Sequence, residues 1–261
     1  MSEAVNLLDE ALIKAGLSVE AESMLSAIHI FHELPSTNEW LLAQGGCGEL
    51  CLAEKQTAGR GRRGRSWQSP SQQNIYLSLR WCYSAVPPNY GCLSLVVGLA
   101  VARALDKLGI SGHGLKWPND IYYHDRKLGG ILLQTAKPLQ QVVIGIGLNA
   151  NMQTEMAEGI DQPWCSLREI SGGIVDRNQV VALILNQLLP ALAGFVNLDR
   201  GQFAAEWLSR DVLAGRPVIV HQSDQRLPGI AQGIDPDGGL LVEMTDGLKR
   251  TFTAADVSVR L

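Results

Sequence analysis

The sequence predicts an α+β fold: a mixed, mainly antiparallel sheet with helices, followed by a small all-β barrel. Between residues 114 and 149, four strand-like runs follow one another with short turns, which favours hairpin connections within one sheet. Long apolar helical patterns flank these runs. After Gly215, short strands are separated by the turns DPDGG and TDG, which is typical of a small barrel. A chain of 261 residues is long enough for both units.

The first thirty residues are expected to form a short helical extension. Their apolar pattern of Val5, Leu8 and Leu12 is broken at Gly16, and a second short pattern follows. Residues 31–212 are then predicted to form the larger domain, and residues 213–261 the barrel. The extension is too short for a complete winged helix-turn-helix domain, so we expect no sequence-specific DNA binding.

The larger domain begins with a helix signal. Ser36 with Glu39 three positions later, directly before Trp40, fits a capping box. Strand-like alternation at 49–54 and 74–81 brackets an arginine-rich segment, and a long apolar helix is expected at 92–109. The remaining predictions are strands at 114–117, 120–123, 128–135 and 141–149, helices near 178–196 and 201–210, and five barrel strands after residue 215.

Composition restricts the class of protein. The formal net charge is −4 and 46% of the residues are hydrophobic, so no broad field attracts nucleic acid or anionic lipid, and anion binding has to be local. Neither a basic signal segment nor an apolar run of membrane-spanning length is present, so we expect a cytoplasmic protein without membrane contact. The five cysteines lack zinc-type spacing, and we expect reduced, mostly buried thiols and no protein-only metal site.

The segment GRGRRGRSW contains the strongest local charge. Its glycines let the backbone approach a ligand, and the side chains of Arg60, Arg62, Arg63 and Arg65 offer paired donors suited to phosphate or carboxylate. Glycine content and like-charge repulsion predict that this loop is mobile when empty. A solvated basic loop and an RNA-binding arginine–glycine segment are the alternatives. The neighbouring strands and Trp67 embed the loop in the fold, which favours ligand binding.

Two further motifs contain candidate site residues. KWPND places Asn119 and Asp120 after a proline that forces an extended or turning backbone, where they could hold a metal-bound phosphate, a ribose or an incoming amine, or simply cap a turn. In DRKLGGILLQ, Lys127 lies at the start of a strand and could neutralise a carboxylate. The adjacent Gly129 and Gly130 leave room for a flat ligand or a bulge.

The segment VVIGIGLNAN formally matches the dinucleotide-binding pattern G-x-G-x-x-A. That pattern requires a helix directly afterwards in a βαβ unit, and residues 151–163 give only a poor helical pattern before Pro163. Asn149 is therefore interpreted as a polar contact to a nucleotide. Neither a P-loop nor a G-x-S-x-G motif occurs, so an enzyme of this sequence would act by positioning and electrostatics.

Taken together and in order, five motifs resemble the catalytic core of biotin protein ligase: STN at 36–38, QTAGRGRRGRSW at 56–67, KWPND at 116–120, DRKLGGIL at 125–132 and GIGLNAN at 145–151. The resemblance covers residues 30–261. It implies a class II synthetase-like biotin/lipoate ligase core and an SH3-like barrel at the C-terminus. It also implies a two-step activity, in which biotin and MgATP give biotinyl-5'-AMP and the biotinyl group passes to a lysine of the biotin carboxyl carrier protein of acetyl-CoA carboxylase.

The resemblance implies roles for individual residues. Arg62, Lys127 and Asp120 would be catalytic, with Asp120 orienting the acceptor lysine or merely capping a turn. The biotin site would comprise Ser36, Thr37, Asn38, Gln56, Arg60, Gly61, Arg62, Lys127, Gly129 and Gly130. The ATP site would comprise Arg62, Arg63, Arg65, Trp67, Asn119 and Asn149.

Two alternatives and one open question accompany this hypothesis. A lipoate protein ligase would use the same chemistry but is disfavoured by the double arginine of GRGRRGRSW, and an RNA-binding module would use the loop alone. ATP, Mg²⁺ and biotin are the expected small molecules. A homodimer stays open, because a sheet edge can pair with a second copy.

Overall fold

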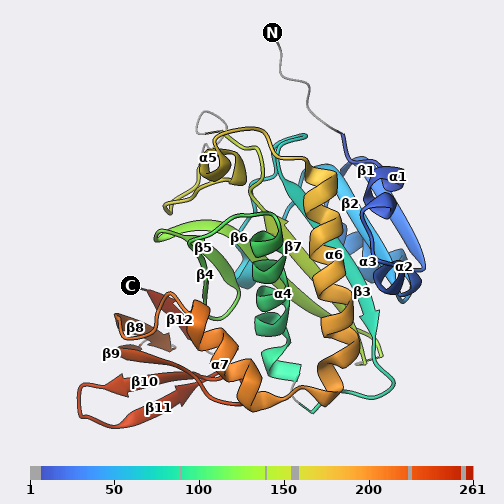
Figure 1. Cartoon of the computed structure of the whole chain (residues 1–261). Helices are drawn as coiled ribbons and strands as arrows, with labels where there is room; N and C mark the ends of the chain where they lie inside the picture. Colours follow the sequence, from blue (N-terminus) through green and yellow to red (C-terminus); the bar gives the residue numbers. More distant parts are fainter. Residues whose placement is uncertain are drawn as a thin grey trace.

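A seven-stranded sheet lies at the centre of the larger part of the chain (Figure 1), with strand order β1-β2-β3-β7-β6-β5-β4. The computed structural model describes residues 7–88, 90–138, 140–153, 159–222, 225–253 and the backbone of 257–260. β1 and β2 are parallel, and the other described neighbours are antiparallel. The predicted α+β fold is confirmed. The strands are β1 (Ala27–Leu34), β2 (Glu49–Gln56), β3 (Ile75–Cys82), β4 (His113–Lys116), β5 (Asp120–Tyr123), β6 (Arg126–Ala136) and β7 (Gln141–Leu148).

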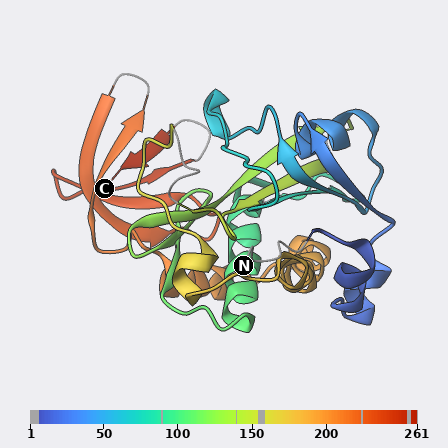
Figure 2. The same ribbon diagram turned by 90° about the horizontal axis from the view of Figure 1, so that it is seen from above.

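Helices cover both faces of the sheet (Figures 1 and 2). The two long helices α4 and α6 pack against each other and against one face, and α3 packs against β2, β3 and β7 on the other. In β2, Leu50 and Leu52 belong to the large core under α4 and α6, whereas Cys51 and Ala53 pack with Leu41 of α3. The α-helices are α1 (Glu10–Ala15), α2 (Val19–Ser23), α3 (Thr37–Gln44), α4 (Leu93–Lys107), α5 (Leu167–Ser171), α6 (Arg177–Gly194) and α7 (Arg200–Arg210).

The described residues of the larger part also include the short 3₁₀ helices η1 (Arg62–Gly64), η2 (Tyr90–Cys92) and η4 (Phe195–Asn197). The predicted capping box at Ser36 forms on one side only. Ser36 Oγ accepts the backbone N–H of Glu39 at 3.5 Å, which satisfies one donor of the helix N-terminus. The Glu39 side chain pairs instead with Arg60.

The N-terminal segment packs against α6 and β1. α1 ends at Ala15 with Gly16 as its cap, as the sequence predicts. Its apolar face is not the expected one, because Ile13 is buried while Leu12 is 58% exposed; Val5 lies outside the described residues. The predicted division at residue 30 falls within β1, so the end of the extension already belongs to the sheet.

β7 shows why the glycine pattern of residues 145–150 is not a dinucleotide-binding motif. The strand pairs antiparallel with both β3 and β6, and a βαβ unit needs parallel strands. The glycines serve close packing instead: a Cβ on Gly145 would overlap the side-chain amide of Asn38, and a Cβ on Gly147 would lie 2.6 Å from Cε2 of Trp67.

A second sheet, called here the C-terminal sheet (Pro217–Arg260), lies beside α7 and the β4–β5 hairpin (Figure 1). It has five strands in the order β11-β10-β9-β8-β12, and the described pairs are all antiparallel. This agrees with the small all-β unit predicted after Gly215. The strands are β8 (Pro217–Gln222), β9 (Gln225–Ile234), β10 (Leu240–Met244), β11 (Lys249–Phe252) and β12 (Val257–Arg260).

The expectation of reduced cysteines is wrong for one pair. Cys47 and Cys82 form a disulfide with their Cα atoms 5.6 Å apart, whereas Cys51, Cys92 and Cys165 are buried and form no disulfide. The antiparallel register of β2 and β3 places Leu50 opposite Leu79. Continuing this register by three residues brings 47 opposite 82. Sequence spacing did not reveal the register, so it could not reveal the pair.

α6 with its η4 continuation is the one described helix that is long and apolar enough to cross a membrane. Its length and composition alone meet that test, and half of the apolar window is buried in the structure. The helix packs along α4 and also contacts β3, α1 and α2. These contacts make it a core helix of this fold.

Candidate active site

A cavity of about 980 Å³ opens beside the carboxyl end of β2 and the N-terminus of α3. Its size is that of a small-molecule site. Every predicted site residue lines it except Gly129. Those residues come from α3, β2, the arginine loop, the 116–120 turn, β6 and β7, and the ones that line the cavity are Ser36, Thr37, Asn38, Gln56, Arg60, Gly61, Arg62, Arg63, Arg65, Trp67, Asn119, Asp120, Lys127, Gly130 and Asn149.

The first turn of α3 and the end of β2 form a polar wall. Backbone N–H and Oγ1–H of Thr37 both donate to Oε1 of Gln56, at 2.9 and 3.2 Å. Nε2 of Gln56 donates to Oγ of Ser69 at 3.2 Å. Thr37 and Asn38 are nearly fully buried, so these hydroxyl and amide groups are held in fixed orientations, as a site for a small polar ligand requires.

Ser78 on β3 belongs to this wall and was missed by the sequence analysis. Its Oγ lies 2.6 Å from Oγ1 of Thr37 and 2.5 Å from Oδ1 of Asn38, and the side chain is fully buried. Asn38 in turn donates to Oε1 of Gln134 at 2.8 Å. A serine between Leu77 and Leu79 in a mostly apolar strand was the available signal, because a buried polar group needs a partner.

The arginine loop (Gly59–Arg65) folds back on itself at the cavity mouth. Backbone N–H of Gly61 donates to the carbonyl of Arg65 at 2.7 Å, and η1 at the loop tip contains Arg63 with φ 57°. This positive φ and that of Gly64 (73°) reverse the chain direction. The sequence predicted a glycine-dependent loop, and these left-handed positions are where that freedom is used.

Two arginines attach this loop to the rest of the site. Nη1 of Arg62 donates to Oδ1 of Asn119 at 3.1 Å, and Arg60 pairs with Glu39 of α3. Burial, and then the neighbouring charge of Arg63, lower the pKa of Arg62. The guanidinium of Arg62 is therefore directed into the cavity, whereas Arg60, with its side chain 55% exposed, lies at the rim.

The register of β5 and β6 shifts between Ile121, which is opposite Gly129, and Tyr122, so the bulge that was one of the two expectations for the paired glycines of β6 is present. A Cβ on Gly130 would lie 3.3 Å from the indole of Trp67, while one on Gly129 would lie 2.9 Å from the backbone oxygen of Gly147 on β7. Gly129 thus faces the neighbouring strand and not the cavity, which corrects its assignment to the biotin site. Trp67 lies across the bare backbone of Gly130 and Gly147. Its Nε1 is buried without a hydrogen-bond partner among the described residues.

Positive charge exceeds negative charge around the cavity. Nζ of Lys127 lies 2.9 Å from Oδ1 of Asp120 and 5.4 Å from the ring centre of Trp67. Nζ of Lys116 donates to the hydroxyl of Tyr122 at 3.3 Å, and burial lowers the pKa of this lysine. The lining basic residues are Arg60, Arg62, Arg63, Arg65, Lys116, Lys127 and Arg216, against Asp120, Asp125 and Asp161. A chain of net charge −4 thus has a cavity that favours anions.

Asn149 acts as a brace within the protein. Its Nδ2 donates to the backbone oxygens of Cys165 at 3.0 Å and Lys127 at 3.4 Å. The backbone of Lys127 is also paired with Pro163 and Cys165, so segment 163–165 runs beside the strand that carries the cavity lysine. Because Nδ2 of Asn149 already donates to these backbone oxygens, the atom left for its predicted contact with a nucleotide is Oδ1.

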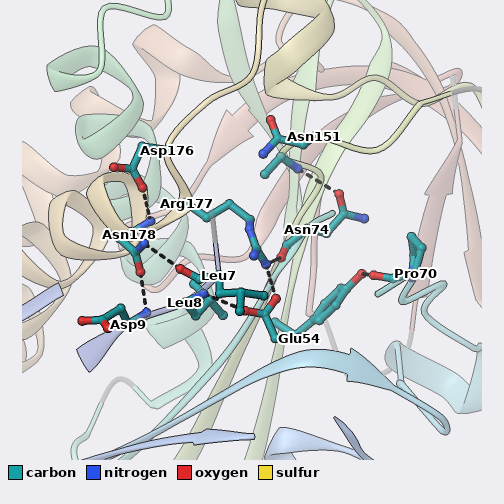
Figure 3. A network of polar contacts seen from close by, with 12 residues as sticks. Leu7, Leu8, Asp9, Glu54, Pro70, Asn74, Asn151, Asp176, Arg177 and Asn178 are labelled. Atoms are coloured by element: carbon teal, nitrogen blue, oxygen red, sulfur yellow. Dashed lines mark hydrogen bonds and ion pairs between the residues drawn. The ribbon is translucent and has the colours of Figure 1, made fainter. Parts of the chain in front are cut away.

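A buried charge network connects β2, α6 and the N-terminal segment (Figure 3). Nη1 of Arg177 lies 2.7 Å from Oε2 of Glu54 and donates to the backbone oxygen of Asn74 at 3.2 Å. Backbone N–H of Leu8 donates to Oε1 of Glu54 at 2.6 Å, and that of Ala150 donates to Oδ1 of Asn74 at 3.0 Å. The sequence analysis did not predict this network. It joins the N-terminal segment and α6 to β2, to Asn74 before β3 and to Ala150 after β7.

Comparison with known proteins decides the family. The description "Biotin/lipoate A/B protein ligase family" applies to a match over residues 31–149, and "Biotin protein ligase C terminal domain" to one over 214–260. The bifunctional ligase/repressor BirA of Escherichia coli is 38% identical over 240 residues, 90% of this chain and 74% of that protein. The chain belongs to the biotin protein ligase family. All predicted site residues of this ligase lie within the range 31–149.

Two further relatives extend this finding over the chain. The biotin–[acetyl-CoA-carboxylase] ligase of Mycobacterium tuberculosis is 34% identical, and the match covers 96% of this chain and 95% of that protein. The structure of biotin protein ligase from Aquifex aeolicus in complex with biotin and ATP superposes with a TM-score of 0.80 at 29% identity. It covers 90% of this chain and 99% of that one. The ligase is therefore an enzyme whose fold agrees with both predicted units.

The residues that the structure describes contain no group of three or more His, Cys, Asp or Glu side chains that could hold a metal ion. Asp120 and Asp161 nevertheless supply carboxylates at the cavity wall. Mg²⁺ typically takes one or two carboxylates together with substrate phosphates. The donor set present thus fits a metal that arrives with a nucleotide.

Proposed function

We propose that this ligase activates biotin with MgATP to biotinyl-5'-AMP and transfers the biotinyl group to a lysine of the biotin carboxyl carrier protein of acetyl-CoA carboxylase. The single observation that carries the proposal is the convergence of Arg62 and Lys127 on one cavity, beside the polar wall of Thr37 and Gln56. A carboxylate and a polyphosphate are both anions, and cations that face both of them lower their repulsion. The Aquifex relative holds biotin and ATP together.

In this proposal the polar wall binds the uncharged ring of biotin. Ser36, Thr37, Asn38 and Gln56 provide hydroxyl and amide groups that match a cyclic urea, which both donates and accepts hydrogen bonds. Gly61 and Arg60 close the rim above it. Lys127 is at the position to neutralise the biotin carboxylate, and its present partner Asp120 would release it when the carboxylate arrives.

The nucleotide would lie on the other side of Arg62. Arg63, Arg65 and Arg62 neutralise phosphates, while Trp67 offers an aromatic face and an indole N–H that has no hydrogen-bond partner in the described part of the chain. Asn149 offers Oδ1 as an acceptor, and Asn119 keeps Arg62 in place. Mg²⁺ entering with ATP supplies further neutralisation of phosphate charge.

The first step joins the biotin carboxylate to the α-phosphorus. A carboxylate oxygen forms the new O–P bond, the bond from the α-phosphorus to the bridging oxygen breaks, and pyrophosphate leaves. Holding the two anions in line is the main contribution of the protein, and Arg62 is placed between the two binding regions to do so. The product is a mixed anhydride that water would hydrolyse, so the arginine loop excludes solvent from it.

The second step transfers the acyl group. The neutral amine of the acceptor lysine attacks the carbonyl carbon, AMP leaves, and the amine proton passes to a base. Asp120 is the carboxylate nearest to Lys127 in the cavity, and we assign it the orientation of the amine and acceptance of that proton. The reaction uses ATP and a carboxylase subunit, so the proposal includes a cytoplasmic location. The absence of sequence-specific DNA binding and the homodimer stay predictions.

Mass spectrometry of a purified carrier domain tests the proposal. After incubation with the ligase, biotin and MgATP, we expect one biotinyl mass increment, and omission of ATP should abolish it. An unmodified but competent carrier would contradict the proposal. Adenylation with labelled lipoate in place of biotin identifies a lipoate ligase, although the match to the biotin protein ligase C-terminal domain favours biotin. Binding of RNA that falls steeply with salt would identify the RNA-binding alternative.

A further inference from the structure

The C-terminal sheet contacts the cavity turn KWPND through one buried hydrogen bond. Nε1–H of Trp117 donates to the backbone oxygen of Gly238 at 3.0 Å, and the tryptophan side chain is almost completely buried. These residues are 121 positions apart in the sequence. Trp117 borders the cavity, but its polar atom is used within the protein and is unavailable to a ligand.

The Gly238 side of this contact is rigid. The turn between β9 and β10, residues 235–239, is closed by its own hydrogen bonds, because Oδ1 of Asp235 accepts the backbone N–H of Asp237 at 2.9 Å and of Gly239 at 2.8 Å. Gly238 has φ 83°, and a Cβ there would lie 2.6 Å from Cβ of Cys92 at the start of α4. Only glycine lets the turn approach α4 so closely.

The Trp117 side of the contact leads directly to the cavity. The next residue, Pro118, accepts a hydrogen bond from Oγ of Ser94 on α4 at 3.0 Å. Asn119 follows, donates through Nδ2 to the backbone oxygen of Ile131 at 2.8 Å and accepts from Arg62. A short series of contacts therefore links the backbone carbonyl of Gly238 to the guanidinium of Arg62. Gly238 accepts from Trp117, Asn119 lies two residues after Trp117, and the side chain of Asn119 accepts from Arg62.

Two other contacts join the chain just before the C-terminal sheet to β4 and to the β5–β6 turn. Backbone N–H of Val212 donates to the oxygen of Leu115 at 3.0 Å, which adds the chain before β8 to the edge of β4. Nη1 of Arg216 lies 2.5 Å from Oδ1 of Asp125 in the β5–β6 turn. That pair is half-exposed, so solvent screens it. Of these three contacts, the buried hydrogen bond between Trp117 and Gly238 is the one that can fix the position of Asn119.

We propose that Trp117 is a positioning residue for adenylate formation, and that turn 235–239 of the C-terminal sheet holds it so that Asn119 can dock Arg62. The C-terminal sheet then contributes to the active site without lining its ligand subsites. The kinetic test of this inference depends on the proposed function. The structural test depends only on how firmly the arginine loop is held.

The kinetic test compares Trp117→Phe, which removes the N–H while keeping an aromatic ring, with the wild type and with the control Trp81→Phe, a half-buried tryptophan at the far end of β3. We expect kcat for biotin-dependent pyrophosphate release to fall about five- to tenfold, the effect of one net hydrogen bond, while the Kd of biotin changes by less than about twofold. A purely structural defect would weaken both. An unchanged kcat in folded Trp117→Phe overturns the inference.

The structural test needs no activity. Trypsin cleavage after Arg62, Arg63 or Arg65, followed by mass spectrometry, measures how firmly Asn119 holds the loop. Cleavage should be about five- to tenfold faster in Trp117→Phe and unchanged in Trp81→Phe. A wild type that forms no adenylate would contradict the proposed function, yet faster cleavage would still support the positioning role, and equal cleavage would overturn it.

A second variant disturbs the other side of the contact. Gly238→Ala displaces the turn from Cys92 and leaves Trp117 intact, and thermal unfolding identifies the fraction that folds. We expect the same loss of kcat and the same faster cleavage, and the double variant should be no worse than the more severe single one, because both changes break one bond. Fully additive losses in the double variant would show that Trp117 and turn 235–239 act separately, which overturns the inference.

Discussion

The arginine loop and the Glu54–Arg177 pair use the same chemistry in opposite ways. At the loop, Arg60 and Glu39 form an ion pair with side chains 55% and 35% exposed. In the buried network, Arg177 and Glu54 are 1% and 5% exposed. An exposed pair can rearrange at little cost, whereas a buried one must stay fully partnered. The exposed Arg60–Glu39 pair can therefore exchange its contact for one with a ligand, whereas the buried Arg177–Glu54 pair holds the surrounding structure in place.

The arginine loop and the buried pair also differ in the parts of the chain that they connect. The loop consists of arginines and glycines with two left-handed residues, and its contacts with the rest of the site can be exchanged for contacts with anions. The buried pair connects β2, α6 and the N-terminal segment, and β2 carries Gln56 two residues after Glu54. A rigid wall and an adaptable closing segment are both needed to bind a small molecule and then enclose an unstable product.

The largest expected effect breaks the buried network. Arg177→Ala leaves the Glu54 carboxylate buried without its guanidinium, so we expect the free energy of unfolding to fall by about 3–5 kcal/mol, measured by urea denaturation. Lys55→Ala, which removes the exposed pair of Lys55 with Glu33, is the matched control and should cost less than about 1 kcal/mol. Similar losses in both variants would contradict the assigned difference between buried and exposed charge.

The next effect acts on chemistry and leaves stability nearly unchanged. Arg62→Ala removes the cavity guanidinium to which we assign neutralisation of both anions, so adenylate formation should slow by about 10²–10³-fold, measured as pyrophosphate release. Escape of any adenylate formed should be faster. The free energy of unfolding should stay within about 1 kcal/mol of the wild type, since the loop is not part of the core. Unchanged pyrophosphate release would remove Arg62 from the catalytic assignment.

Closure of the loop can be measured directly. Trypsin should cut the free enzyme between Arg60 and Arg65, and biotin with ATP should suppress this cleavage by at least about 100-fold when each ligand is present at 100 times its Kd, because binding stabilises the closed form. Cleavage at sites in the C-terminal sheet serves as the internal control and should not change. Equal cleavage of the loop with and without ligands would contradict its role as a closing segment.

The sequence predicted the fold well where the signal is local. The helix after Ser36, the long helices α4 and α6 and the hairpin order of β4 to β7 all follow from caps, periodicity and turn residues. Nearly all of the site residues that it indicated line the cavity, because the motifs around Arg62, Asn119 and Lys127 place polar groups where strands end.

The rest depends on which strands become neighbours. Cys47 meets Cys82 through the register of β2 and β3, and Gly129 turns from the cavity because β6 pairs with β7. The roles of Ser78 and the buried Arg177 are evident only from their partners on other elements, which are Thr37 and Glu54 respectively. No local pattern contains that information, since strand pairing over tens of residues is set by the packing of the whole sheet.

The smallest expected effect extends the comparison to the rigid wall. Ser78→Ala removes the hydroxyl shared by Thr37 and Asn38 while leaving the side chains of Thr37, Asn38 and Gln56 in place. One net hydrogen bond contributes about 0.5–1.5 kcal/mol, so we expect biotin to bind up to about tenfold more weakly, measured by calorimetry without ATP.

The split between binding and chemistry decides what Ser78 does. If the wall only orients Thr37 and Asn38 toward biotin, kcat at saturating biotin should stay within about twofold of the wild type, in contrast to Arg62→Ala, where kcat falls. Ser23→Ala, an exposed serine at the end of α2, is the control and should change neither quantity. A fall in kcat with an unchanged Kd of biotin would mean that Ser78 serves the adenylation step, and the separation of a rigid binding wall from a cationic closing loop would fail.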